Sequence, residues 1–387
     1  MPKILLIGNS DEFQYSMKLF PELLQALLRQ RGIPVELIRP KTVAGRLAPW
    51  AGRLGKWLFY IDKFLIFPLI LQARLLRERG ETGLVVHICD HSNGMYVHRL
   101  RGVPHLVTCH DLMPIRSALG EVPQNPTSWT GRRFQALILR GLRRARMVAC
   151  VSTQTRDDFI RIAQVPESRT RVILNAINYP YSPMPEGEAR ARVAALLGGD
   201  FPYLFHIGGD AWYKNRAGLV ALYAELRRRW PWPEREIPKL VNAGPSLTRE
   251  IAPFLEADPG LARDVIGLQG PDSETLRALY SRAEALVFPS WDEGFGWPII
   301  EAQACGCRVL TTGKAPMTEV GGEAAFYLDP ADVPGAAEAV LGVLRQSGAE
   351  KAASIARGLE NAGRFSQDQM IGQYIRLYRE LLGEVVE

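Results

Sequence analysis

Residues 3–10 read KILLIGNS, an apolar run that ends at a glycine, an asparagine and a serine. Leucines at helical spacing follow between residues 19 and 28, and residues 35–39 (VELIR) again have the composition of a strand. A strand, a helix and a second strand in this order form a βαβ unit, which builds domains with parallel sheets. This stretch therefore predicts an α/β domain at the start of the chain.

The same alternation of apolar runs and helical stretches continues through the chain. Strands are expected at 84–89, 105–109, 147–152 and 171–175, and then at 203–208, 238–244, 263–268, 285–290, 307–312 and 324–328, with helices that include 273–283 and 298–305. Residues 178–189 hold three prolines and no periodic pattern, which indicates a linker.

We therefore expect two doubly wound, Rossmann-like domains facing across a cleft. The N-terminal domain would span residues 1–180 and the C-terminal domain residues 190–365. Residues 366–387 would form a final helix, with a return to the N-terminal domain as one option. Ligands of such sheets bind at the carboxyl ends of the strands.

Length, composition and charge exclude several classes of protein. The 387 residues suit two domains, and 47% hydrophobic with 23% charged residues excludes a disordered chain. Residues 1–185 hold 26 bases and 13 acids, whereas the remainder holds 21 and 28, so an anionic partner should favour the N-terminal half. The five scattered cysteines predict free thiols, with Cys305 and Cys307 as small buried residues. The opening lacks the plan of a signal peptide, so a cytoplasmic location is the expectation.

Residues 47–76 are rich in Trp, Phe, Leu and Ile. Their longest uncharged apolar run has eight residues, against about 20 for a membrane span. One interpretation is a pair of core helices. The other is a helix on an anionic membrane surface, in which bases face lipid phosphates and aromatic side chains insert: Arg46, Arg53, Lys56, Lys63, Trp50, Trp57 and Phe59. The arginine-rich stretch 132–146 has the same two interpretations.

A second motif combines two carboxylates with glycines and a helix start. Residues 287–301 read VFPSWDEGFGWPIIE, with Glu293 and Glu301 eight positions apart and Pro298 suited to a first helical turn. Exposed backbone N–H groups at such a helix start favour polar or anionic ligands. A carboxylate can accept both hydrogens of a vicinal diol, so the pair points to a sugar ligand.

Residues 288–320, FPSWDEGFGWPIIEAQACGCRVLTTGKAPMTEV, resemble the retaining glycosyltransferases of family 4, the group 1 transferases with the GT-B fold. Residues 206–209 (HIGG) with Lys214, Gly267 with the helix from Ser273, and residues 108–111 (TCHD) resemble further motifs of this family in the expected order. The resemblance implies transfer of a hexose from a nucleotide diphosphate sugar to a hydroxyl of a glycan or lipid-linked acceptor, with retention of configuration.

The resemblance also implies roles for individual residues of the donor site. Glu293 would contact the donor hexose, Glu301 the ribose diol, and Lys214 the diphosphate, whose developing charge it would neutralise. The backbone amides of Gly294, Phe295 and Gly296 would bind hydroxyls of the donor sugar. Gly8 would let the first loop of the N-terminal domain approach the diphosphate closely. Family members often carry an Arg shortly before the Lys, and this chain does not; the two candidates to replace it are Arg216 and the backbone of Gly209.

On the acceptor side, the resemblance implies that His110 faces the transferred sugar, with Asp90, His91 and Asp111 near the acceptor. The alternative for His110 is an ordinary buried histidine at a strand end. The sequence has no DxD triplet, and His87 with His91 would diverge after a strand, so a zinc site is not expected. We expect transfer without a metal or other cofactor and no nucleic-acid partner. Alternatives are an inactive scaffold of the same fold and a GT-B epimerase or hydrolase.

Overall fold

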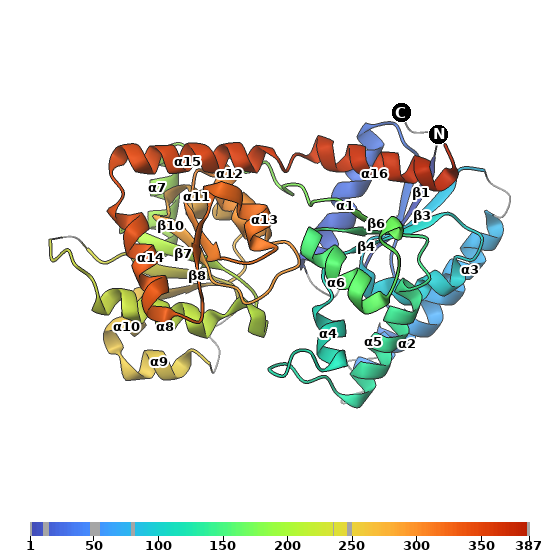
Figure 1. Ribbon diagram of the computed structural model, residues 1–387, viewed down its shortest axis with the longest axis horizontal. Coiled ribbons are helices and arrows are strands. Elements are labelled where there is room, and N and C mark those ends of the chain that lie inside the picture. Colours follow the sequence, from blue (N-terminus) through green and yellow to red (C-terminus); the bar gives the residue numbers. More distant parts are fainter. Residues whose placement is uncertain are drawn as a thin grey trace. The chain divides into compact units, whose positions relative to one another are not determined.

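The structure is a computed structural model, and it describes residues 2–10, 15–46, 55–78, 82–234, 236–245 and 250–384; for residues 15–17, 55 and 56 it describes the backbone alone. The chain forms two compact units (Figure 1). Unit 1 comprises Met1–Leu174 and Gln367–Glu387, and unit 2 comprises Asn175–Ser366.

Unit 1 is built on a parallel six-stranded sheet with the order β2-β1-β3-β4-β5-β6. Its strands are β1 (Lys3–Ile7), β2 (Val35–Ile38), β3 (Leu84–Ile88), β4 (His105–Cys109), β5 (Met147–Cys150) and β6 (Thr170–Val172). Its helical elements are α1 (Tyr15–Gln30), α2 (Gly55–Ile61), η3 (Asp62–Ile66), α3 (Phe67–Arg77), η4 (His91–Arg99), α4 (Met113–Leu119), α5 (Trp129–Leu142), α6 (Thr153–Ala163), η5 (Glu167–Arg169) and α16 (Gln367–Leu382).

Unit 2 repeats the architecture with the sheet order β12-β11-β10-β7-β8-β9, again parallel. Its strands are β7 (Tyr203–Ile207), β8 (Lys239–Ala243), β9 (Val265–Leu268), β10 (Ala285–Phe288), β11 (Val309–Thr312) and β12 (Phe326–Leu328). Its helical elements are α7 (Glu186–Leu197), η6 (Trp212–Lys214), α8 (Arg216–Arg228), α9 (Ala252–Ala257), α10 (Pro259–Asp264), α11 (Ser273–Arg282), α12 (Trp297–Ala304), α13 (Met317–Gly321), η7 (Gly322–Ala324), α14 (Val333–Arg345) and α15 (Gly348–Gly363).

The predicted fold class is confirmed, because two doubly wound parallel sheets are present and every predicted strand exists. The strands were readable because both faces of each sheet carry helices, so a central strand such as Leu84–Ile88 is buried at all five positions. Helix starts follow the usual capping chemistry. The side chain of Asp272 accepts a hydrogen bond from the backbone of Thr275 at the start of α11.

The last helix, α16, belongs to unit 1 although it ends the described chain. Its residues Tyr374 and Tyr378 are buried against the sheet. The Tyr378 hydroxyl lies 2.7 Å from Nδ1 of His87 on β3, and the Tyr374 hydroxyl lies 3.0 Å from Oγ1 of Thr108 on β4. Nε2 of His87 lies 2.8 Å from the same threonine oxygen. Burial lowers the pKa of His87 to about 3, so it is neutral near pH 7.

The segment predicted as a linker packs within unit 2. The Tyr179 hydroxyl donates a hydrogen bond to Glu274, and the backbone N–H of Met184 donates one to Ser281, both on α11. The ring of Tyr181 meets the ring of Tyr280 edge-on. These contacts place residues 178–189 against the helix that also carries a neighbour of Glu301.

Residues 55–77 form one continuous helical segment in which η3 is a π turn between α2 and α3. The core interpretation is correct for one side of it, where Phe67, Leu71 and Leu75 are buried. Asp62 is also buried and accepts hydrogen bonds from the backbone of residues 43–45. Trp57 lies on the exposed side.

Two residues of the membrane interpretation do not face outward as predicted. Lys63 is half-buried, burial lowers its pKa, and Asp90 is near enough to act in the opposite direction. Phe59 is half-buried, and a Cβ on Gly45 would approach its ring to 2.6 Å. Trp50, Arg53 and the side chain of Lys56 lie outside the described residues.

All five cysteines are free, as predicted, and all five are buried. Within the part of the chain that the structure describes, no helix has both the length and the apolar character needed to cross a bilayer.

Candidate active site

The chemistry-bearing residues of unit 2 follow two adjacent strands, β7 and β10. The chain order reverses between these strands, since β7 lies between β10 and β8. Such a switch point is where doubly wound sheets bind ligands, because the loops after the two strands turn to opposite faces and leave a crevice. Lys214 follows β7, and Glu293 follows β10.

Hydrogen bonds hold the two loops together. The backbone N–H of Trp291 donates to the carbonyl of Tyr213 at 2.7 Å, and the side-chain amide of Asn215 donates to the carbonyl of Pro289 at 3.0 Å. Asn215 has a φ of 53°, a left-handed conformation that asparagine tolerates better than most residues. These contacts hold the two residues that flank Lys214, Tyr213 and Asn215, against the loop that leads to Glu293.

Lys214 and Glu293 form an ion pair, with 2.7 Å between Nζ and Oε1. Both side chains are largely buried, at 16% and 7% exposure. The ammonium group also lies 5.1 Å from the centre of the Phe288 ring. A largely buried cation and a buried carboxylate are thus held side by side. The ammonium group can bind an anionic group of a ligand, and the carboxylate can accept hydrogen bonds from ligand hydroxyls.

Glu301 on α12 is buried, and its Oε2 accepts a hydrogen bond of 3.0 Å from the hydroxyl of Tyr280 on α11. Burial raises the pKa of Glu301 to about 7, although the Tyr280 hydrogen bond and Lys214 both act to lower it. The carboxylate therefore gains or loses its proton close to neutral pH. Sequence motifs alone did not identify Tyr280 as the partner of Glu301.

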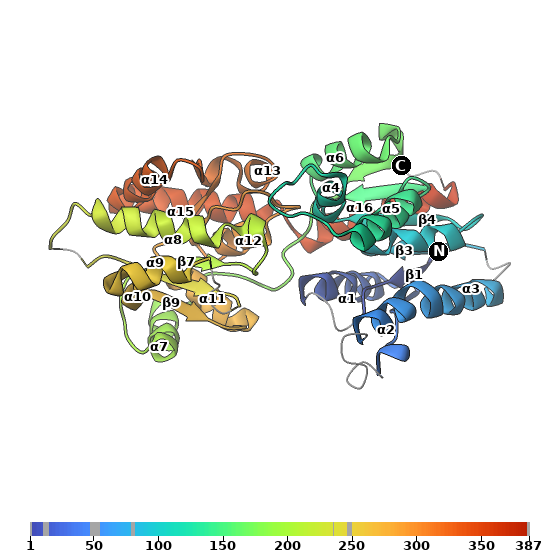
Figure 2. The ribbon, with the colours of Figure 1, turned by 90° about the horizontal axis from the view of Figure 1, so that it is seen from below.

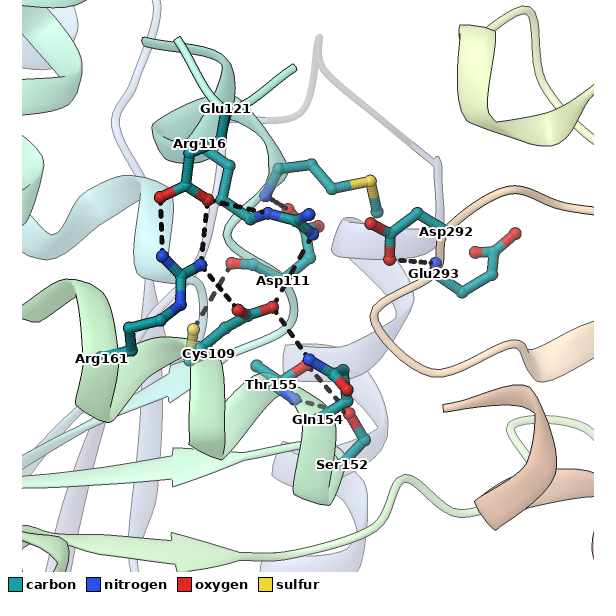
Figure 3. Close-up of polar contacts among 12 residues, drawn as sticks. Cys109, Asp111, Arg116, Glu121, Ser152, Gln154, Thr155, Arg161, Asp292 and Glu293 are labelled. Atoms are coloured by element: carbon teal, nitrogen blue, oxygen red, sulfur yellow. Dashed lines mark hydrogen bonds and ion pairs between the residues drawn. The ribbon is translucent and has the colours of Figure 1, made fainter. Parts of the chain in front are cut away.

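The residues between the two glutamates form the start of α12. Gly296 caps this helix with a φ of 101°, a conformation that favours glycine. Phe295 is buried against Phe365 and Trp297. The Glu293 backbone N–H donates to the side chain of Asp292 (Figure 3).

The loop after β7 leaves space for a ligand at one glycine and none at another. A Cβ on Gly209 would meet nothing within 4 Å, whereas a Cβ on Gly208 would lie 2.9 Å from His206. His206 is buried, and its Nδ1 donates to the carbonyl of Val287 on β10. Burial lowers its pKa to about 4.

Arg216, the candidate replacement for the missing family arginine, begins α8 and is buried. Its guanidinium bonds to the carboxylate of Asp210 at 2.9 Å and to the carbonyl of Pro245 at 2.8 Å. Arg216 is therefore held by protein groups, and a ligand diphosphate would have to compete with Asp210 for it.

In unit 1 the corresponding switch point lies between β1 and β3. Asn9 follows β1, and its side-chain amide donates to Asp90, which follows β3. The buried Asn93 donates to the side-chain oxygen of Asn9 at 2.6 Å. A Cβ on Gly8 would lie 3.2–3.3 Å from Arg39 and Leu37, so little room exists for a larger residue. The sequence analysis missed both asparagines.

Asp90 and the histidines beside it are buried. Burial alone would raise the pKa of Asp90, but His91, His110 and the backbone N–H of Ser92 outweigh it and bring the value to about 2. Nε2 of His110 donates to the carbonyl of Cys89 at 2.9 Å, and burial lowers the pKa of His110, so the neutral imidazole is favoured. His91 lies between Asp90 and Asp111, with Nδ1 3.5 Å from the first carboxylate and Nε2 4.0 Å from the second.

A charged network that the sequence analysis also missed lies on α4, α6 and the loop between α4 and α5. Glu121 accepts two hydrogen bonds from Arg161 and forms an ion pair with Arg116 (Figure 3). Arg116 also forms an ion pair with Asp158. Asp158 accepts a further bond from Gln154. Two arginines and two carboxylates balance within this network.

Within the described ranges, His, Cys, Asp and Glu side chains form no group of three or more that could hold a metal ion. His87 in particular is occupied by Tyr378 and Thr108 in the interior.

Two family models match the chain. The model for Glycosyltransferase Family 4 matches residues 22–179, and the model for Glycosyl transferases group 1 matches residues 202–346. Together the two matches cover more than half of the chain. The chain belongs to the group 1 glycosyltransferases of family 4.

Curated relatives agree with this assignment. The glycosyltransferase is 29% identical over 331 residues to O-antigen chain mannosyltransferase B of Escherichia coli, covering 81% of each chain. It is 27% identical over 336 residues to a D-inositol 3-phosphate glycosyltransferase of Salinispora tropica, covering 81% of this chain and 67% of the relative.

Among solved structures, sucrose-phosphate synthase from Thermosynechococcus elongatus matches with a TM-score of 0.72 at 20% identity, over 99% of this chain and 100% of that one. Anabaena HepE in complex with UDP and glucose matches with a TM-score of 0.69 at 19% identity, over the whole of both chains. At these identities the likeness shows the fold of the glycosyltransferase.

Proposed function

We propose that this glycosyltransferase moves a hexose from a nucleotide diphosphate sugar to a hydroxyl of a glycan or lipid-linked acceptor, with retention of anomeric configuration. The observation that carries the proposal is the buried Lys214–Glu293 pair beside Glu301 at the switch point of unit 2. A cation and two carboxylates at one crevice suit a ligand that combines a diphosphate with hydroxyl groups.

The donor would bind to unit 2. Glu301 in its ionised form would accept both hydroxyl hydrogens of the ribose, and Glu293 would accept hydroxyls of the hexose. The backbone amides of Gly294, Phe295 and Gly296 would serve the hexose, and the open space at Gly209 would admit the diphosphate close to the backbone.

Lys214 would favour the transition state. As the bond from the anomeric carbon to the diphosphate oxygen breaks, its electron pair leaves on the diphosphate, and the acceptor oxygen forms the new bond while its proton passes to the departing group. Negative charge grows on the diphosphate during this step, so a fixed ammonium group stabilises the transition state more than the ground state. Arg216 would contribute after exchanging its contact with Asp210.

The acceptor would bind to unit 1, where His110, Asp90, His91 and Asp111 would meet it and the transferred sugar. The relative O-antigen chain mannosyltransferase B is named for a glycan chain, which supports a glycan or lipid-linked acceptor here. Gly8 would allow close approach of a phosphate. The two arginines and two carboxylates of the network around Arg116 leave it without net positive charge. We therefore expect this part of unit 1 to recognise hydroxyl groups of the acceptor.

Three further properties complete the proposal. Transfer requires no metal ion or other cofactor, because Lys214 supplies the charge that a cation would otherwise supply. The protein works in the cytoplasm, at the inner face of the cell membrane. Its partners are the donor, the acceptor and an anionic membrane surface, without a nucleic acid.

Product analysis with a panel of sugar nucleotides tests the proposal. Incubation with glycan and lipid extracts should release the nucleoside diphosphate and form a glycoside in which the anomeric configuration of the donor is kept. A sugar nucleotide changed without an acceptor would indicate an epimerase or hydrolase instead. Binding without turnover across the whole panel would indicate an inactive scaffold.

A further inference from the structure

Exposed apolar side chains are concentrated on one part of unit 1. The described residues include fifteen large apolar side chains that are strongly exposed, and nine of them lie on the segment 55–77 or on α5. We call these nine the apolar surface: Trp57, Tyr60, Ile61, Leu65, Leu69, Ile70, Leu76, Trp129 and Leu137. Soluble proteins rarely gather so many such side chains without a partner.

The π turn explains how one segment can serve both the core and this surface. Trp57, Ile61, Leu65 and Leu69 recur every four residues, a spacing that drifts by about 40° per turn on a regular α-helix. The wider turn at η3 reduces this drift, so the four side chains stay on the outer side. α2 and α3 follow one another along unit 1 in both views (Figure 1, Figure 2).

Aromatic stacking joins this segment to α5. The ring of Phe134 lies 4.9 Å from that of Tyr60 and 4.7 Å from that of Phe64, with nearly parallel planes. α5 and the residues after it also expose a row of arginines: Arg132, Arg133, Arg140, Arg143, Arg144 and Arg146. The apolar surface and the arginines therefore belong to one packed assembly of helices.

The segment 55–77 and α5 carry no exposed acidic side chain. The sequence holds no Asp or Glu between Glu121 and Asp157, and the one acid within residues 55–77, Asp62, is buried. His98 senses the resulting positive electrostatic potential. Burial lowers its pKa, and the positive charges of nearby arginines lower it further: Arg144, Arg140, Arg101 and Arg99. Unit 1 as a whole holds 28 bases and 17 acids.

We infer that this surface docks on an anionic lipid bilayer, with the apolar side chains of the 55–77 segment inserted among the acyl chains and the arginines of α5 bound to lipid phosphates. The inference rests on the membrane partner of the proposed function and supplies the residues that would meet it. Apolar side chains bordered by arginines, on helices that expose no carboxylate of their own, fit a surface that is both apolar and negatively charged. Insertion would explain why Leu65 and Leu69, at 61% and 64%, are among the most exposed.

Flotation of the full chain with phosphatidylglycerol–phosphatidylcholine vesicles tests the inference. We expect binding at low salt, weaker binding at high salt, and little binding to phosphatidylcholine alone. Leu65→Glu with Leu69→Glu should abolish flotation. Arg140→Glu with Arg144→Glu should lower the partition coefficient at least tenfold, since each base near an anionic leaflet contributes roughly a fivefold factor.

Matched variants separate docking from general effects. Leu119→Glu changes a leucine of unit 1 with 55% exposure outside the surface, and Arg192→Glu with Arg357→Glu changes the net charge on unit 2 as much as the double arginine variant does on unit 1. Both should float as the unmodified protein does, and thermal melting should show that every variant is folded. Equal losses in control and surface variants, or no flotation at low salt, would overturn the inference.

Two further measurements test whether a second copy of the chain covers the surface and whether docking is separable from transfer. A dimer in size-exclusion chromatography that the Leu65→Glu, Leu69→Glu variant dissolves would show that a second copy covers the surface, which also overturns the inference. Release of nucleoside diphosphate with a short soluble acceptor should persist in the surface variants. Docking can then fail while transfer is intact, and transfer can fail while docking is intact.

Discussion

Replacing Tyr280 with Phe should shift the pH at which the donor binds, because this tyrosine is the hydrogen-bond donor to the carboxylate of Glu301. A hydrogen bond to a charged group contributes about 1.5–3 kcal/mol, and one pKa unit corresponds to 1.36 kcal/mol. From a starting value of about 7, the pKa of Glu301 should therefore rise by roughly one to two units in the variant.

Only the ionised carboxylate can accept both hydroxyls of a diol. In the unmodified protein, affinity for a nucleoside diphosphate should therefore rise between pH 6 and 8 and level off above. Tyr280→Phe should weaken binding about tenfold at pH 7 and much less at pH 9, when Glu301 is ionised again. Isothermal titration calorimetry across this range measures the effect, and binding at pH 6 should release a proton to the buffer.

Tyr203→Phe is the matched control, because this tyrosine is equally buried in unit 2 but donates to a backbone carbonyl, that of Leu279. It should leave the pH midpoint unchanged. A flat affinity between pH 6 and 8 in the unmodified protein would refute the reasoning, as would an equal loss at every pH in Tyr280→Phe. Glu301 also makes the stability of the folded unmodified protein depend on pH, because burial raises its pKa from 4.5 to about 7. The folded protein retains the Glu301 proton between pH 4.5 and 7, so this residue lowers the free energy of unfolding as pH rises through that window.

Three further predictions follow from other contacts. Lys214→Ala should lower kcat more than it weakens donor binding, because charge grows on the diphosphate during the reaction; single-turnover kinetics with calorimetry would measure both, and an equal loss in affinity with unchanged kcat would leave only an anchoring role. Activity should persist in excess chelator, whereas a loss that magnesium restores would contradict the metal-free proposal. Tyr378→Phe should lower the free energy of unfolding by about 1–3 kcal/mol, since Nδ1 of His87 loses its partner. Urea denaturation would measure it, with the exposed Tyr60→Phe as control, and equal stabilities would contradict it.

The sequence predicted the strands well because each is a short apolar run buried on both faces, and burial of this kind leaves its mark on consecutive residues. It also singled out Glu293, Glu301 and Lys214 as candidates, because their motifs are local, and the structure pairs Lys214 with Glu293. Contacts between distant segments were not readable. The Lys214–Glu293 pair joins residues 79 positions apart, and Tyr280 meets Glu301 only because α11 packs against α12.

The N-terminal unit shows the same limit more strongly. Asn9 and Asp90 carry no motif of their own, and their contact depends on the parallel pairing of β1 and β3. The inward position of Lys63 depends on a π turn, which widens the helix by one residue and leaves no pattern in a run of mixed apolar and charged residues. One interpretation of the sequence therefore placed Lys63 among the bases that face lipid, whereas its side chain is half-buried.

The seating of α16 on the first sheet has a consequence for the order in which the protein can mature on the ribosome. Domains generally fold in the order of their synthesis. Here β3 and β4 emerge early, but the tyrosines that satisfy His87 and Thr108 emerge 291 and 266 residues later, after every strand of the second sheet. The second unit can thus be finished first, while the first waits with polar groups of its sheet uncovered. Nascent chains stalled before residue 367 should expose this sheet to proteases and chaperones, and chains extended through α16 should not.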